Sequence, residues 1–303
     1  MYQAKENGRQ TYKFFTSSMN QRAVQRQSIE EGLCRALDAG EFEVYYQSKV
    51  HLKTGRISGA EALLRWTHPV RGMISPADFI PVAEDSGLIV PIGKWVLRQA
   101  CRQAQEWISR GFHLPTIAVN ISAMEFRRED FLEGILEVLA ATGLNPGHLV
   151  LEPTESVLTK HVDAAESVLK ALRVIGVKVA VDDFGTGYSS LSYLRKFPID
   201  ELKIDQSFVR QIATSPDDCL IVTAVIGIGR SLNLRVVAEG VETLEELNFL
   251  KARDCDEAQG HYFSRPVPSE KFVALLESAA AVERCPLPTS THTLPNAELL
   301  VEP

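Results

Sequence analysis

The stretch Val177-Lys-Val-Ala-Val-Asp-Asp-Phe-Gly-Thr-Gly-Tyr-Ser-Ser190 joins a β-branched run to an acid pair and a glycine-containing loop. The run at 177–181 predicts a buried strand, and the two glycines permit a tight turn after it. A plain strand-to-helix connection that ends at a serine cap would also explain the loop. The acid pair Asp182 and Asp183 at the strand end favours a functional site, because perturbed acids cluster at such sites.

Similar runs recur along the chain and alternate with helical segments. Strands are predicted at 116–121, 148–152, 177–181, 201–204, 234–238 and 255–258. Helices are predicted at about 131–142, 162–175, 217–231 and 244–251. This alternation is typical of a parallel sheet covered by helices.

The segment before this alternation reads differently. Residues 44–50 and 57–65 extend on either side of a turn at 53–56, which predicts an antiparallel pair. One helix is expected to start at Ser75-Pro76, and a second, longer helix is expected to run from about 91 to 110. The opening pair and the six later runs make eight strands, and over about 250 residues this number favours a closed α/β barrel over an open sheet.

A polar residue stands at or just past the end of seven of these runs. In a barrel the carboxyl ends of the strands share one face, on which active sites are built. Singly, each residue could be a helix cap or a solvated charge, but together their five carboxylates would repel one another unless protons or cations neutralised them. The residues are Glu61, Asn120, Glu152, Asp182 with Asp183, Lys203, Glu239 and Gln259.

Cations are the simplest solution for this rim. Carboxylate and amide oxygens suit Mg²⁺ or Mn²⁺, and the seven histidines show no zinc-binding spacing. An adjacent aspartate pair can let one carboxylate bridge two metals. Two such metals form the apparatus of phosphodiester hydrolysis.

Glu61 and Arg65 lie on the same side of their segment, in strand or in helix. A local salt bridge is the simplest explanation of that spacing. The rim favours the alternative, in which Glu61 holds a metal and Arg65 is free to bind a phosphate.

Composition sets further limits. With 303 residues, 45% of them hydrophobic, the chain can bury a sizeable core. A net charge of -7 argues against binding nucleic-acid polymers. The apolar runs are too short to cross a membrane, and no membrane contact is expected from this chain. A cytoplasmic location is expected, whether or not a larger protein supplies an anchor. Five scattered cysteines predict reduced, mostly buried thiols.

In order and spacing, the motifs resemble the EAL-domain cyclic di-GMP phosphodiesterases over about residues 28–280. The resemblance implies a modified TIM (β/α)8 barrel with an antiparallel first strand, which opens cyclic di-GMP to linear pGpG with two Mg²⁺ or Mn²⁺ ions. Ca²⁺ is expected to inhibit, because it prefers longer bonds and more ligands than Mg²⁺. The motifs are EALLRW at 61–66, VNIS at 119–122, EPTE at 152–155, DDFGTGYSSL at 182–191, KID at 203–205, AEGVE at 238–242 and QG at 259–260.

The same resemblance implies roles for single residues. Lys203 is similar to the lysine that positions the attacking water, Glu239 to the general base, and Glu155 to the glutamate that anchors the DDFGTG loop. The implied metal ligands are Glu61, Asn120, Glu152, Asp182 and Asp183. The implied substrate residues are Gln47, Arg65, Glu242 and Gln259.

The ends of the chain suggest a larger context. Residues 1–15 resemble the end of a GGDEF domain, 16–41 form a helical lead-in, 42–283 form the barrel, and 284–303 are expected to be disordered. A GGDEF domain in the full-length protein and a homodimer through the DDFGTG loop are expected partners.

Three departures from the family pattern spare the implied metal ligands: Ser48, Pro153 and His261. The alternative function is a receptor or regulatory domain that binds cyclic di-GMP without hydrolysing it.

Overall fold

The computed structural model describes residues 17–160, 162–187 and 191–284. The expected GGDEF remnant at 1–15 lies outside these residues. The expected tail also lies outside them, except for Arg284, which ends the last helix.

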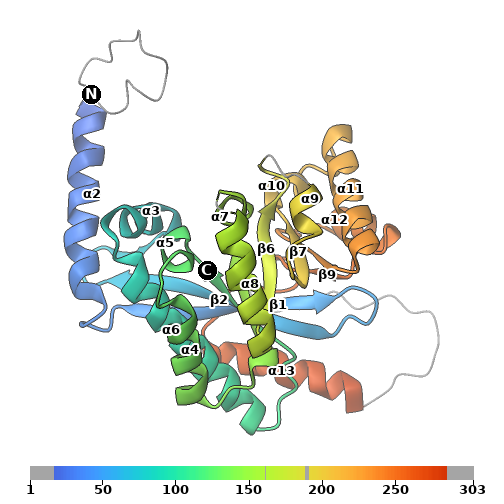
Figure 1. The fold of residues 1–303 in the computed structure, drawn as a ribbon, viewed down its shortest axis with the longest axis horizontal. Helices are drawn as coiled ribbons and strands as arrows, with labels where there is room; N and C mark the ends of the chain where they lie inside the picture. Colours follow the sequence, from blue (N-terminus) through green and yellow to red (C-terminus); the bar gives the residue numbers. More distant parts are fainter. Residues whose placement is uncertain (1–16, 161, 188–190, 285–303) are drawn as a thin grey trace, which may run out of the picture.

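Eight strands close into a barrel, which confirms the expected fold class (Figure 1). Around the barrel the order is β1-β9-β8-β7-β6-β5-β4-β2, and β2 pairs again with β1. The strands are β1 (Phe42–His51), β2 (Ile57–His68), β4 (Ile117–Ile121), β5 (Leu149–Pro153), β6 (Lys178–Phe184), β7 (Glu201–Ile204), β8 (Arg235–Ala238) and β9 (Glu257–Ala258), with β3 (Gly72–Ile74) outside the ring on β2.

The first strand is antiparallel to both of its neighbours, as the hairpin pattern predicts. Gly55 in the turn has φ 69°, a left-handed conformation that glycine adopts without strain. The register sets Gln47 opposite Glu61 and Glu43 opposite Arg65. The hairpin therefore brings Gln47, from the first strand, beside the glutamate that opens the EALLRW motif.

Helices surround the barrel (Figure 1). They are α2 (Ser17–Ala36), α3 (Pro76–Ser86), α4 (Ile89–Ser109), α5 (Ala123–Phe126), α6 (Phe131–Thr142), α7 (Glu155–Thr159), α8 (Val162–Ile175), α9 (Leu191–Leu194), α10 (Gln206–Val209), α11 (Pro216–Leu232), α12 (Leu244–Ala252) and α13 (Ser269–Arg284), with a 3-10 turn at Pro146–His148. The α2 helix is the predicted lead-in. Its buried Ile29 and Leu33 belong to the same core as Trp66 of β2.

Alternation along the strands separates two environments. Residues such as Val119, Leu151 and Leu202 face the helices and join the main hydrophobic core. The barrel interior holds a separate small cluster of Ala118, Val150 and Ala180. Most other interior positions carry charge, with lysines and glutamates buried inside the ring.

The four cysteines within the described residues are free thiols. Cys101 and Cys255 are buried and Cys219 is half-buried, whereas Cys34 is exposed on α2, so the expectation of mostly buried thiols does not extend to Cys34. Among the described helices, none combines the length and the apolar character that a membrane span requires.

Candidate metal centre and active site

Lys203 of β7 lies at the centre of the acidic rim. Its side chain is buried, and its Nζ is 2.6 Å from an oxygen of Glu152 and 2.6 Å from one of Glu239. Asp182 and Glu61 follow at 3.2 and 3.7 Å. Burial alone would lower the pKa of Lys203, but the surrounding carboxylates outweigh it and raise this pKa well above its usual value. Four of the five predicted acids therefore converge on one ammonium group.

Two amides hold Glu61 from either side. Asn120 Nδ2 donates to Oε1 of Glu61 and Gln259 Nε2 donates to Oε2, each over 2.6 Å. Gln259 Nε2 also donates to Gln47 Oε1 over 2.9 Å. Burial tends to raise the pKa of Glu61, but Lys203 and these two donors lower it overall, so the carboxylate stays ionised.

Asp182, Asp183 and Glu239 form the group best arranged for a cation within the described residues. One oxygen from each lies within 4.8 Å of the others. Asp183 has φ 54°, a left-handed conformation that bends the chain at the strand end, and its backbone N–H donates to Asp182 Oδ1 over 3.0 Å. Burial and the Asp182 carboxylate raise the pKa of Asp183 to about 6. A cation would remove that repulsion, so these residues fit a metal.

Glu239 therefore belongs to the group of acids that could bind a cation, which its implied role as a general base did not predict. It lies among the oxygens of the aspartate pair. Burial raises its pKa well above the usual value despite the opposing effect of Lys203.

Glu152 supplies a second sign that the site fits a metal. Its Oε1 is buried and has no hydrogen-bond partner, while its Oε2 contacts Lys203. Burial raises the pKa of Glu152 to about 7. Buried polar atoms are almost always satisfied, so an unpartnered carboxylate oxygen beside Asn120 and the aspartates suits a hard cation.

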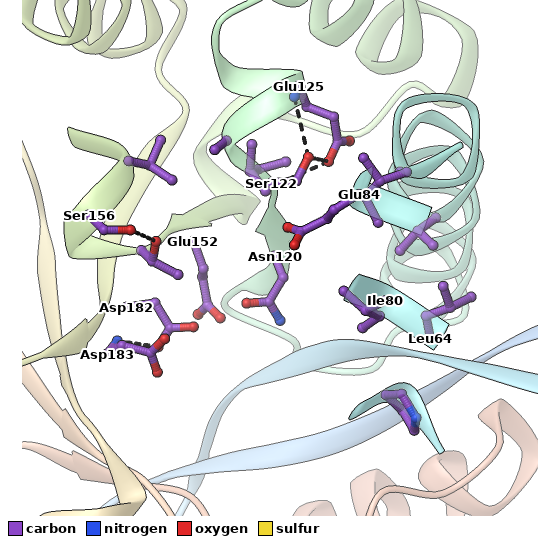
Figure 2. A pocket seen from close by; sticks show the side chains of 18 of the residues that line it. Leu64, Ile80, Glu84, Asn120, Ser122, Glu125, Glu152, Ser156, Asp182 and Asp183 are labelled. Carbon is purple, nitrogen blue, oxygen red and sulfur yellow. Dashed lines mark hydrogen bonds between the residues drawn. The ribbon is translucent and has the colours of Figure 1, made fainter. Parts of the chain in front are cut away.

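Figure 2 shows Asn120, Glu152 and Asp182 directed from three strands toward one space, with Glu84 facing them from the opposite wall. The space is a cleft of about 790 Å³ that Leu64 and Ile80 also line. A smaller cleft of about 250 Å³ lies on the other side and is lined by Arg210, Glu242 and Gln259 among others. Asn120 and Asp182 line both clefts, so the predicted metal ligands lie where the clefts meet.

Arg65 lines the larger cleft and makes no ion pair with Glu61. Its guanidinium lies 5.4 Å from the centre of the Tyr45 ring, and its Nη1 donates to the Leu64 carbonyl over 2.9 Å. The local salt bridge is absent between these two described residues, which leaves the Arg65 charge available to the cleft.

Glu155 contacts the loop that it is expected to anchor. Its Oε2 accepts a hydrogen bond from the Gly185 backbone over 3.1 Å. A Cβ on Gly187 would lie 2.7 Å from Oε1, so the loop packs closely on the carboxylate. The Thr186 hydroxyl donates to the Asp183 carbonyl over 2.8 Å. The backbone of the loop, rather than the Thr186 side chain, is bound by Glu155.

Glu242 lies apart from the acidic rim, in the smaller cleft. Its Oε1 is 2.8 Å from Arg210 Nη2 and 3.6 Å from His261 Nδ1. The departure at position 261 thus contacts a predicted substrate residue. Ser48 pairs with the hydroxyl of Ser264 at 2.8 Å, and Pro153 ends β5 as a buried residue.

Sequence reasoning missed Lys49, a completely buried residue of β1. Its Nζ is 3.4 Å from Glu201 Oε2 and 3.8 Å from the unpartnered Oε1 of Glu152. Strand alternation offers the signal, because Lys49 lies two residues after Gln47 and so faces the same interior. Arg210 also went unnoticed, since nothing in the local sequence pairs it with Glu242.

Comparisons with known proteins agree with this geometry. The family model described as EAL domain matches residues 30–266. MucR of Pseudomonas aeruginosa, a bifunctional diguanylate cyclase/cyclic di-GMP phosphodiesterase, is 45% identical over 274 residues, which is 90% of this chain and 40% of MucR. The cyclic di-GMP phosphodiesterase PdeR of Escherichia coli is 41% identical over 272 residues, which is 90% of this chain and 41% of PdeR.

Among solved structures, one described as the PaMucR phosphodiesterase in a c-di-GMP complex matches with a TM-score of 0.79 and 44% identity. The match covers 81% of this chain and 99% of that one. The chain spans less than half the length of MucR and of PdeR. The match to the family model, over a barrel with its acids at the strand ends, shows that this chain belongs to the EAL domain family.

Proposed function

We propose that this domain hydrolyses one phosphodiester of cyclic di-GMP to give linear pGpG. The observation that carries the proposal is the convergence of Glu61, Glu152, Asp182 and Glu239 on Lys203, where two clefts meet. The names of MucR, its solved domain and PdeR support the substrate.

Two clefts of unequal size suit a substrate with two nucleotides. The larger cleft offers Leu64 and Ile80 as an apolar wall for one guanine and Arg65 for a phosphate oxygen. The smaller cleft offers Arg210 and Gln259 to the second half. The scissile phosphate would then lie over the rim that both clefts share.

The residues fit two Mg²⁺ or Mn²⁺ ions, held by Glu61, Asn120, Glu152, Asp182 and Asp183. Such ions lower the pKa of a bound water and neutralise phosphate charge. The mixed oxygen donors and the unpartnered oxygen of Glu152 support this assignment.

The protein groups have separate tasks in the reaction. Lys203 Nζ holds the water oxygen that forms the new bond to phosphorus, and a carboxylate oxygen of Glu239 takes the proton of that water. The bond between phosphorus and the 3′ oxygen breaks, and that oxygen takes a proton from solvent to become a 3′ hydroxyl, while the phosphate stays on the 5′ oxygen of the other nucleotide as the 5′-phosphate of pGpG. Glu155 keeps the loop after β6 in place, and Arg65 holds the phosphate for in-line attack.

The test is incubation of the chain with cyclic di-GMP and Mg²⁺, followed by chromatography of the products. We expect pGpG, none with excess chelator, and none from Glu61→Ala or Asp182→Ala, while Arg98→Gln on the outer surface of α4 behaves as wild type. Binding of cyclic di-GMP with no pGpG at any Mg²⁺ or Mn²⁺ concentration would instead establish the receptor function. Turnover by either rim variant would contradict the metal assignment.

The expected context belongs to the same proposal. We place residues 42–283 in the catalytic barrel, residues 16–41 in a lead-in, and residues 1–15 at the end of a preceding GGDEF domain. The combined activities in the name of MucR support that partner. A homodimer through the loop after β6, a cytoplasmic location and a disordered tail are further expectations, and a sizing measurement with and without cyclic di-GMP tests the dimer.

A further inference from the structure

A basic cleft lies at the end of the barrel opposite the acidic rim. It has a volume of about 700 Å³ and is bordered by the first residues of β6 and β8, the end of α8 and the segment after α9. Four cations line it: Arg173, Lys178, Arg195 and Arg235. The whole chain has a net charge of -7, so four cations around one cleft give this surface a charge of the opposite sign.

One acid, Asp200, also lines the cleft, and its carboxylate is partly occupied by the backbone. Asp200 uses Oδ2 to accept the Val179 backbone N–H over 2.9 Å. Arg235 is occupied too, because it binds the buried Glu201 and lies 3.9 Å from Glu257. Residues at this face of a barrel commonly stabilise the fold, and the ion pairs of Arg235 give it that role.

The other three cations have no ion pair or hydrogen bond within the part of the chain that the structure describes. Arg173 lies in the last turn of α8, where a cation complements the helix dipole, so its charge has a second explanation. Arg195 follows the end of the short helix α9, whereas Lys178 begins a strand and has no such explanation. Lys178 is half-buried, and its burial and the nearby Arg235 lower its pKa although Glu201 and Asp200 act in the opposite direction. An anion in the cleft would relieve this repulsion.

We propose that this cleft binds a phosphate dianion, either free or as the terminal group of a phosphate monoester. Three cations without an ion pair among the described residues, around a concave site, favour a doubly charged oxyanion over a singly charged diester. Arginine offers paired donors that match phosphate oxygens, and Lys178 supplies a point charge in the lining of the cleft. The site is separate from the acidic rim, so it stands whether or not the proposed hydrolysis occurs.

The experiment is calorimetric titration of the whole chain, in metal-free buffer, with inorganic phosphate, methyl phosphate and dimethyl phosphate. We expect the two dianions to bind and dimethyl phosphate to bind at least about tenfold more weakly, since it carries one charge less. Lys178→Gln and Arg195→Gln should each weaken binding of the dianions by about tenfold or more, the scale of one charge-assisted hydrogen bond. Arg98→Gln is the matched control and should bind as wild type.

A second measurement guards against loss of folding. The dianions should raise the unfolding midpoint of wild type and of Arg98→Gln, but raise it much less in Lys178→Gln and Arg195→Gln. Binding of phosphate without binding of methyl phosphate would assign the site to the free ion. Equal affinity of wild type and both cleft variants, or equal affinity for dimethyl phosphate, would overturn the proposal.

Discussion

Replacing Lys49 with methionine should lower the free energy of unfolding of the barrel, although the local sequence does not mark Lys49 as a stabilising residue. Lys49 is fully buried, with its Nζ 3.4 Å from Glu201 and 3.8 Å from Glu152. Burial tends to lower the pKa of Lys49, but the neighbouring glutamates raise it overall, so the side chain is charged. Methionine keeps most of the hydrocarbon packing and removes only that charge.

The size of the expected loss of stability depends on which cationic partner each glutamate keeps. Breaking a buried ion pair by removing one partner costs about 3–5 kcal/mol. Glu201 still binds Arg235 and Glu152 still binds Lys203, so the loss should fall at the lower end, about 3 kcal/mol. Adding Glu201→Gln to the variant should recover part of the loss, because the buried carboxylate that has lost one of its two cationic partners is then replaced by a neutral amide.

The assay is urea unfolding in chelator, so that metal binding does not contribute. Lys94→Met is the matched control, since Lys94 pairs with Glu137 on the surface at 2.9 Å and its removal should leave the unfolding free energy nearly unchanged. If Lys49→Met proves no less stable than Lys94→Met, the buried ion pairs of Lys49 with Glu201 and Glu152 do not stabilise the barrel.

Four further outcomes are expected. Arg65→Ala should raise KM strongly and leave metal affinity intact, because a phosphate contact is lost; a collapse of metal affinity in a metal titration would refute this. Glu155→Ala should weaken metal affinity and turnover by about 10–100-fold, and unchanged metal dependence of activity would show that its hydrogen bond to Gly185 is unimportant. Calcium should inhibit turnover, since it prefers longer bonds and more ligands than Mg²⁺, and equal rates in the two ions would contradict this. Burial raises the pKa of Glu125 to about 7, so its contribution to stability is full below its usual pKa near 4.5 and is lost as pH rises through 7. Glu125→Gln should therefore reduce the fall in unfolding free energy between pH 5 and pH 8 by up to about 3 kcal/mol, and an identical pH dependence in both proteins would exclude this.

Much of the barrel could be predicted because strand and helix periods are local. The helices α6 and α8 and the strand β7 match their expected bounds, and the antiparallel hairpin was also predicted. Strand ends were less certain: β6 continues to Phe184, so the aspartate pair lies within the strand, and β9 keeps only two residues. Strand ends depend on pairing with neighbours, which a single segment does not reveal.

The site was predicted in composition but not in arrangement. The polar residues of the rim do meet at one face of the barrel, although Glu61 lies within β2 and not at its end as expected. Glu61 contacts Gln259 and Asn120 rather than Arg65. These contacts depend on the register of β1 with β2 and on the closure of the barrel. The place of Glu239 beside the aspartates and the contact of Lys49 with Glu152 are long-range facts of the same kind.

The charged interior of the barrel also shapes how stability should change with temperature. Unfolding normally raises the heat capacity because apolar surface meets water, whereas exposing polar surface lowers it. Lys49, Lys203, Glu152, Glu201 and Glu257 fill space that hydrocarbon side chains fill in most barrels. The heat-capacity change per residue should therefore fall below the usual range, which makes the stability curve flatter. In addition, the cost of burying these charges decreases on warming, so the interior loses less of its stability with heat than an apolar one would.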